Sequence, residues 1–93
     1  MANDAKAPQL DFTAFVLSLG SSALINLGLA PDPMTQQKQP ADLALAQQSI
    51  DLLALLQEKT RGNLTADEAP LLENLLFDLR MRFVETVQAG AKK

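Results

Sequence analysis

The stretch FTAFVLSLGSSALINLGLA, residues 12–30, has no charged side chain, in a chain of 93 residues with a formal net charge of −3. An uncharged run of this length is expected of a buried helix, an assembly surface or a membrane segment. Asp11 is placed to cap a helix, because its carboxylate accepts backbone N–H bonds and suits the positive end of the helix dipole. Pro31 and Pro33 cannot continue a helix. The sequence therefore predicts a first helix over about residues 11–30.

This first helix has no fully polar side. On a helical wheel one side gathers Phe12, Phe15, Val16, Leu19, Ala23 and Leu27. Small or short polar side chains recur at steps of four and form a ridge that would let another backbone approach closely, here called the small-residue ridge: Ala14, Ser18, Ser22 and Asn26. Two interpretations stay open, a helix that faces only its own core and a helix that self-associates through this ridge.

Two more helices follow a polar connector, PDPMTQQKQP, at residues 31–40. The second helix is expected over about residues 41–61, with Pro40 at its start and Gly62 available as a left-handed cap. It carries two apolar stripes, and two stripes need two neighbours. The stripes are Leu43, Ala46, Ile50 and Leu53, and Leu45, Ser49, Leu52 and Leu56.

The third helix is expected over about residues 66–87. Thr65 and Glu68 have the spacing of a capping box. Pro70 removes one early backbone hydrogen bond, which favours a start of the regular helix nearer Asp67. Its buried face is predicted to contain Leu72, Leu75, Leu76, Leu79, Phe83 and Val87. Asp78 and Arg82 are four apart, in the order that favours an exposed ion pair.

These elements predict an all-α protein. The composition agrees, with eighteen leucines, 47% hydrophobic residues and 4% aromatics. The short turn after Gly62 makes the second and third helices an antiparallel hairpin, with the first helix packed on it. We expect one helical domain over residues 11–87, flanked by flexible tails at 1–10 and 88–93. Because this apolar surface exceeds what three helices can hide, we expect a homo-oligomer, a dimer or higher.

The composition argues against several classes of function. The chain has no His and no Cys, which removes the commonest general base, the thiolate nucleophile and the commonest metal ligands. Its acidic side chains fall mostly on polar helix faces, and its glycines form no phosphate-binding loop. We expect no enzyme, no cofactor and no metal. Scattered cations and the absence of Trp and Tyr argue against nucleic acid as a partner.

A membrane segment is the main alternative for residues 12–30. Nineteen residues would just cross the hydrocarbon layer of a bilayer, which is about 30 Å thick. Three Ser, one Asn and two Gly weaken this interpretation, and the flanks have no cationic bias and no aromatic belt. The first residues, MANDAKAPQLD, do not resemble an export signal. We expect a cytoplasmic protein. A third alternative for its function is the binding of a small apolar ligand.

Two segments together resemble a known family, FTAFVLSLGSSALINLGLAPDP at residues 12–33 and LQEKTRGNLTADEAPLLENLLFDLRMRFVE at residues 56–85. They are similar to small bacterial proteins grouped as domain of unknown function 1844. The resemblance implies a cytoplasmic bacterial helical protein and brings no catalytic residues. Pro70 departs from the helix-forming residues expected at that position.

The function expected from the sequence is therefore a helical interaction or oligomerisation module that acts through residues 12–30. Its partner is a second copy or another protein. Arg80 joins the candidate interface because Arg80 and Arg82 point in different directions on a helix, which leaves one of them available to an interface. The alternative is that both serve solubility at the surface, with pairing at a spacing of four. The candidate interface residues are Phe12, Ala14, Phe15, Ser18, Leu19, Ser22, Asn26 and Arg80.

Overall fold

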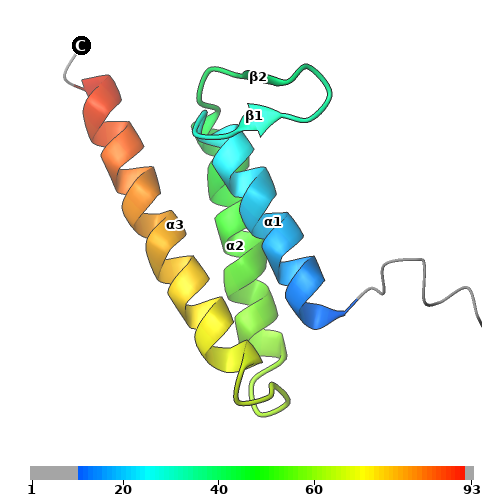
Figure 1. Cartoon of the computed structure of the whole chain (residues 1–93). Helices are drawn as coiled ribbons and strands as arrows, with labels where there is room; N and C mark the ends of the chain where they lie inside the picture. The colour runs from blue at the N-terminus through cyan, green and yellow to red at the C-terminus, as the bar shows by residue number, and fades with distance from the viewer. Residues whose placement is uncertain (1–10, 92–93) are drawn as a thin grey trace, which may run out of the picture.

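The computed structural model describes residues 11–91, which form three helices and one small sheet (Figure 1). The helices are α1 (Phe12–Asn26), α2 (Leu43–Lys59) and α3 (Glu68–Ala91). The sheet pairs β1 (Pro31–Asp32) with β2 (Gln37–Lys38) in antiparallel register. The tail predicted for residues 1–10 lies outside the described residues, as do residues 92–93.

The three helices pack side by side, and each runs opposite to the one before it in the chain (Figure 1). Each contributes one narrow stripe of small or aliphatic side chains to a shared core, as the helical period requires. The predicted all-α fold, with α2 and α3 as a helical hairpin and α1 packed on it, is therefore confirmed. The buried apolar residues are Val16, Ala23 and Leu27 from α1 and its cap, Ala46, Ile50 and Leu53 from α2, and Leu72, Leu76 and Leu79 from α3.

The first helix ends four residues earlier than predicted, at Asn26 instead of Ala30. The cause is Gly28, whose φ of +77° is a left-handed conformation that favours glycine. The N–H of Gly28 donates to the carbonyl of Ile25 at 3.0 Å, and that of Leu29 donates to Leu24 at 2.9 Å. This pair of bonds is a Schellman motif, which satisfies the last carbonyls of the helix. The prolines that follow do not set the end of α1.

The connector is more ordered than its polar composition predicts. Asp32 holds the turn of the β-hairpin, because its side chain accepts from the N–H of Met34 at 2.8 Å and its carbonyl accepts from the N–H of Gln36 at 2.6 Å. Gln36 takes a positive φ of 59° to close the turn. The returning strand then passes over Gly28, and the N–H of Asp42 donates to the carbonyl of Asn26 at 2.6 Å. The connector thus ties the end of α1 to the start of α2.

The start predicted for the second helix at Pro40 is wrong. Asp42 is the N-cap of α2, since its carboxylate accepts from the N–H of Leu45 at 3.0 Å, and Pro40 lies in the connector before it. A side-chain acceptor outweighs the preference of proline for a first helical position. At the other end Thr60 caps the helix, and its hydroxyl donates to the carbonyl of Leu56 at 2.7 Å.

The capping box predicted at the start of α3 is present. The N–H of Thr65 donates to the carboxylate of Glu68 at 3.0 Å, and the N–H of Glu68 donates to the hydroxyl of Thr65 at 3.1 Å. Pro70 therefore does not prevent the cap, although it supplies no N–H to the first turn. The helix also continues past the predicted end at Val87 and runs to Ala91, so residues 88–91 are helical rather than a tail.

At Gly20 the backbone of α1 packs closely against Leu75 of α3. Gly20 is buried, and a Cβ atom at this position would lie 3.0 Å from Cδ2 and 3.1 Å from Cδ1 of Leu75. An alanine here would require Leu75 to shift by a few tenths of an ångström, and a large side chain would overpack the contact between α1 and α3. Glycine in a helix interior is less favourable than alanine, but here the absence of a side chain permits close packing.

We predict that Gly20→Leu lowers the free energy of unfolding by about 2 kcal/mol, because the added side chain overpacks a filled core. Gly90→Leu is the matched control, since Gly90 is also helical and a Cβ atom there would meet no other atom within 4 Å. The control should show no loss, because leucine is the better helix former. Urea denaturation measures both, and equal stability of the two variants would contradict the packing described for Gly20.

We predict that Gly28→Ala destabilises the fold more than Gly62→Ala does. Both glycines have positive φ, so each alanine pays about 1 kcal/mol for a left-handed backbone. At Gly28 the Cβ would also lie 2.8 Å from the carbonyl oxygen of Gln39, whereas at Gly62 it meets no atom within 4 Å. The difference should be about 1 kcal/mol or more in urea denaturation. Equal losses of unfolding free energy in the two variants would show that the connector moves away from the added Cβ atom at little cost.

Candidate functional site

The small-residue ridge lies on the surface of the protein. Ala14, Ser18 and Ser22 are exposed, and Asn26 is half-buried at the end of α1. No residue from Phe12 to Asn26 is charged, so the solvent side of α1 is an uncharged helix face. An exposed helix normally carries charged and polar residues on its outer side. The outer face of α1 is therefore unusual in having no charged side chain, since its exposed polar groups are serine hydroxyls.

An apolar groove runs between α1 and α2 beside this ridge. It is called the α1–α2 groove here and encloses about 230 Å³. Three of its side chains are large and well exposed, namely Phe15 at 43%, Leu52 at 45% and Leu55 at 50%. The groove is lined by Phe15 and Leu19 of α1 and by Leu52, Leu55, Leu56 and Lys59 of α2.

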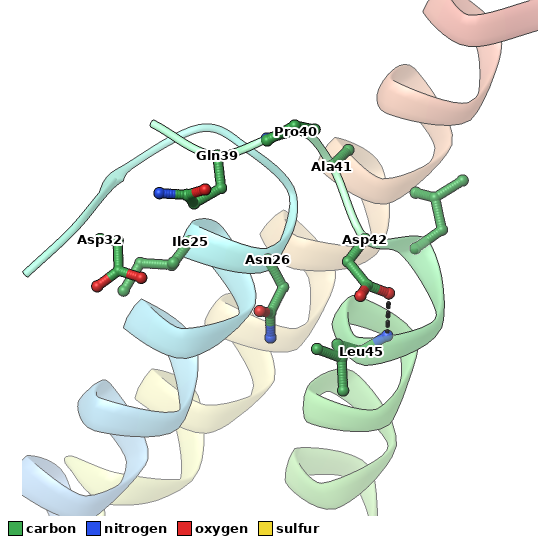
Figure 2. A pocket seen from close by; sticks show the side chains of 9 residues that line it. Ile25, Asn26, Asp32, Gln39, Pro40, Ala41, Asp42 and Leu45 are labelled. Atoms are coloured by element: carbon green, nitrogen blue, oxygen red, sulfur yellow. Dashed lines mark hydrogen bonds between the residues drawn. The ribbon is translucent and has the colours of Figure 1, made fainter. Parts of the chain in front are cut away.

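A second hollow, of about 630 Å³, lies at the opposite end of the same two helices, beneath the β-hairpin (Figure 2). We call it the hairpin pocket. Asn26 extends into it from the end of α1, and the dashed line in Figure 2 marks the bond by which Asp42 caps α2. Its walls combine carboxylates and amides with aliphatic side chains, and they are Ile25, Asn26, Asp32, Gln39, Pro40, Ala41, Asp42, Leu43 and Leu45.

The two hollows belong to one face of the molecule. On α2, Leu45 lines the hairpin pocket and Leu52, Leu56 and Lys59 line the α1–α2 groove, at spacings of seven, four and three that follow one side of a helix. On α1, Phe15 and Asn26 line the two hollows with Ser22 between them at helical spacing. In Figure 2, α3 lies behind α1 and α2. We call this surface the α1–α2 face.

Of the predicted interface residues, Phe15 and Leu19 line the α1–α2 groove and Asn26 lines the hairpin pocket. Ala14, Ser18 and Ser22 are exposed on α1 and line neither hollow. Phe12 and Leu19 are half-buried and pack against the core, so they support the groove more than they present a surface.

Arg80 belongs to a different surface. It is exposed and lines a groove between α2 and α3, together with Gln57, Glu73, Asn74, Leu76 and Phe77. No residue of α1 lines that groove, whereas the α1–α2 groove is made by α1 and α2. The structure therefore does not bring Arg80 together with the other predicted interface residues.

Arg82 forms the exposed ion pair that the sequence predicts. Its Nε donates to the carboxylate of Asp78 at 2.8 Å. The hydrogen bond to Asp78, and the negative charge of that carboxylate, raise the pKa of Arg82 above its usual value. A pair this exposed adds little to stability. It does occupy Arg82, which leaves Arg80 as the cation of α3 that faces the α2–α3 groove.

Sequence reasoning missed the part of the face that comes from α2. The second apolar stripe of this helix was expected to be covered by α1, but only Ser49 is buried and Leu56 half-buried, while Leu45 and Leu52 remain exposed. Leu55, which belongs to neither stripe, is exposed as well. The signal was present, because leucines at 45, 52 and 55 occupy more of the helix surface than one neighbouring helix can cover.

The geometry of the face suits contact with another polypeptide. Small-molecule sites commonly enclose about 300–1,000 Å³ and bury most of the ligand. The α1–α2 groove is smaller and open, so it fits one or two side chains rather than a whole ligand. The hairpin pocket has a volume in this range, about 630 Å³, but it is also open to solvent. Within residues 11–91 no three acidic side chains gather as a metal site would require.

The membrane alternative for residues 12–30 can be compared with the helices of the structure. Throughout the part of the chain that the structure describes, no helix combines the length and the apolarity needed to span a membrane.

A comparison with protein-family models finds a match to the family described as Domain of unknown function (DUF1844), over residues 9–85. This match confirms the resemblance seen in the two sequence segments, and it extends across the connector and all three helices up to Glu85. No curated protein and no solved structure matches the chain.

We predict that Leu55→Ala costs less than about 1 kcal/mol of unfolding free energy, because half of the side chain is exposed already. Leu53→Ala is the matched control from the core and should cost about 2–5 kcal/mol. Both are measured by urea denaturation at concentrations where the midpoint does not change on dilution. A loss at Leu55 as large as that at Leu53 would mean that the α1–α2 face is needed by the fold itself.

Proposed function

Since the chain belongs to the family described as Domain of unknown function (DUF1844), which names no activity, we propose a function from the chain's own surface: a non-enzymatic protein–protein interaction module that binds its partner through the α1–α2 face. We place this activity in the bacterial cytoplasm, in keeping with the absence of cysteine. The partner is another copy of the chain or a different protein.

The observation that carries the proposal is the outer side of α1, which is exposed and has no charge from Phe12 to Asn26. Soluble monomers seldom leave a large apolar surface unoccupied, and such patches commonly mark interaction sites. Here the ridge adjoins a groove with three large apolar side chains that are about half exposed. Burying them against a partner would add about 25 cal/mol for each Å² removed from water.

The small size of the ridge residues favours a polypeptide as the partner. Ala14, Ser18 and Ser22 leave room for a second backbone to approach α1 closely, and the serine hydroxyls can donate across the contact. The groove beside them accepts an apolar side chain. A helix laid along α1 would satisfy both features, as in helix-in-groove recognition.

We predict that Ser18→Glu and Ser22→Glu each abolish assembly, since a charge at the ridge must be desolvated without a partner. Assembly is followed by the diffusion of the fluorescently labelled chain, both purified and in a lysate of its native cells. The wild type should diffuse more slowly than a 10 kDa monomer in at least one of these two samples, and each variant should diffuse as a monomer in both.

Ala89→Glu is the control for added charge, because Ala89 is exposed on α3, away from this face. It should diffuse like the wild type. Monomeric diffusion of the wild type in both samples would overturn the proposed function, as would unchanged assembly of both serine variants. Circular dichroism confirms that all three variants remain folded.

A further inference from the structure

The α1–α2 face carries opposite charges at its two ends. Among the residues that line its two hollows, Lys59 is the one cation and lies in the α1–α2 groove. The hairpin pocket at the other end is lined by two carboxylates, Asp32 and Asp42. Between the two ends α1 contributes no charge at all. Among the side chains that line the two hollows, the charge is therefore positive at one end of the face and negative at the other, and α1 adds none between them.

The apolar side chains also differ between the two ends of the face. The groove at the Lys59 end is hollow between Phe15 and Leu52, and it can accept a side chain. At the opposite end Leu45 is 48% exposed and projects at the edge of the hairpin pocket. One end thus offers a recess and the other offers a leucine.

A surface with these properties is complementary to itself after a half turn. A two-fold axis that lies in the plane of the face, perpendicular to the helices and near the middle of the face, places a second copy opposite the first and exchanges the two ends. Ser18 and Ser22 lie near the middle of α1, at the point where this axis would cross, so that the small-residue ridges of two copies meet each other. The span from Asp42 to Lys59 is 17 residues of helix, about 25 Å, which is long enough to keep the two charged ends apart.

We infer that the partner of the α1–α2 face is a second copy of this chain, docked antiparallel about a two-fold axis, with Lys59 of each copy against Asp32 and Asp42 of the other. This inference rests on the proposed function and names the partner for the same face. In the dimer, Leu45 of each copy enters the groove beside Phe15 of the other. Such isologous contact closes on itself and forms a dimer, not a fibre.

In this dimer the apolar contacts provide affinity, and the charges determine the orientation of docking. Exposed ion pairs contribute little affinity, but opposite charges select the orientation of docking and like charges exclude the alternative. In a parallel arrangement Lys59 would face Lys59, and the two carboxylate ends would meet. The antiparallel arrangement is the one in which every charge that lines the face meets its opposite.

A second exposed apolar surface, on α3, lacks this self-complementarity. On α3, Phe77 is 68%, Met81 48% and Val84 51% exposed. They lie among charged side chains of the same helix, Glu73, Asp78, Arg80, Arg82 and Glu85. A second copy docked there would have to desolvate several of these charges. Docking on the α1–α2 face desolvates no charge along α1, because α1 has none.

The test uses the purified full-length chain and two charge-reversal variants, Lys59→Glu and Asp32→Lys. Sedimentation equilibrium should show a dimer for the wild type. Each variant alone places two repulsive pairs in its homodimer and should dissociate at least about tenfold more readily. An equimolar mixture of the two variants forms a heterodimer in which both contacts between positions 32 and 59 again join opposite charges, and one like-charge contact with Asp42 remains. The mixture should therefore associate at least about threefold more tightly than either variant alone.

Arg61→Glu is the control for the charge change. Arg61 is an exposed cation that lines a different groove, with Gln57, Gly62, Leu64, Ala69 and Glu73, so its dimer should be unchanged. A mixture as weakly associated as its components would overturn the antiparallel pairing, even if Asp32→Lys disturbs the β-hairpin, because mixing rescues only a contact between copies. Unchanged dimerisation of Lys59→Glu would overturn it as well.

The orientation has an independent readout. The chain has no cysteine, so Glu58→Cys gives a single site for a nitroxide label at the Lys59 end. In the antiparallel dimer the two labels lie at opposite ends, about 25 Å or more apart. Labels within about 15 Å of each other would show a parallel dimer and overturn the inference. A purified wild type that stays monomeric would also overturn it, while the proposed function would stand if diffusion in lysate remained slow and sensitive to Ser18→Glu.

Discussion

The close approach of α1 to α3 at Gly20 is the contact on which the arrangement of the three helices depends. Leu75 fills the space that a side chain on Gly20 would take. With this contact in place, α1 presents Val16, Gly20, Ala23 and Leu27 to the core, and these small and medium residues let three helices share one narrow stripe each. The consequence appears on the outside, because turning these residues inward turns Ala14, Ser18 and Ser22 toward solvent.

The sequence predicts the helices well wherever a side chain satisfies a helix terminus. Asp11 accepts from the N–H of Ala14 at 2.8 Å, and Thr65 and Glu68 form their reciprocal bonds, as their spacing indicates. The apolar period correctly places Ile50, Leu53, Leu72 and Leu79 in the core. These features are local, so a pattern of a few residues contains all the information needed.

The errors arise where a distant contact decides the outcome. Gly28 could be a residue within a helix or its end, and the strand that returns over it at Gln39 favours the end. Pro40 and Asp42 both suit a helix start, and the bond from the N–H of Asp42 to Asn26 in α1 favours Asp42. Residues 88–91 carry no apolar pattern, yet they continue a helix already formed. The predicted burial of Val87 is wrong, because its side chain is 40% exposed near the end of α3.

The early end of α1 has a consequence for the α1–α2 face. Asp32 and Asp42 are both backbone hydrogen-bond acceptors, one in the β-hairpin turn and one at the cap of α2, so their positions are fixed by the connector. If α1 continued to Ala30, the chain would leave this end of the helix pair without the turn that brings both carboxylates to the hairpin pocket. Termination at Gly28 therefore creates the negative end of the face, opposite Lys59. In this way the same connector that joins two helices supplies the charge asymmetry by which the proposed dimer selects its orientation, and an uncharged α1 leaves that selection to the two ends alone.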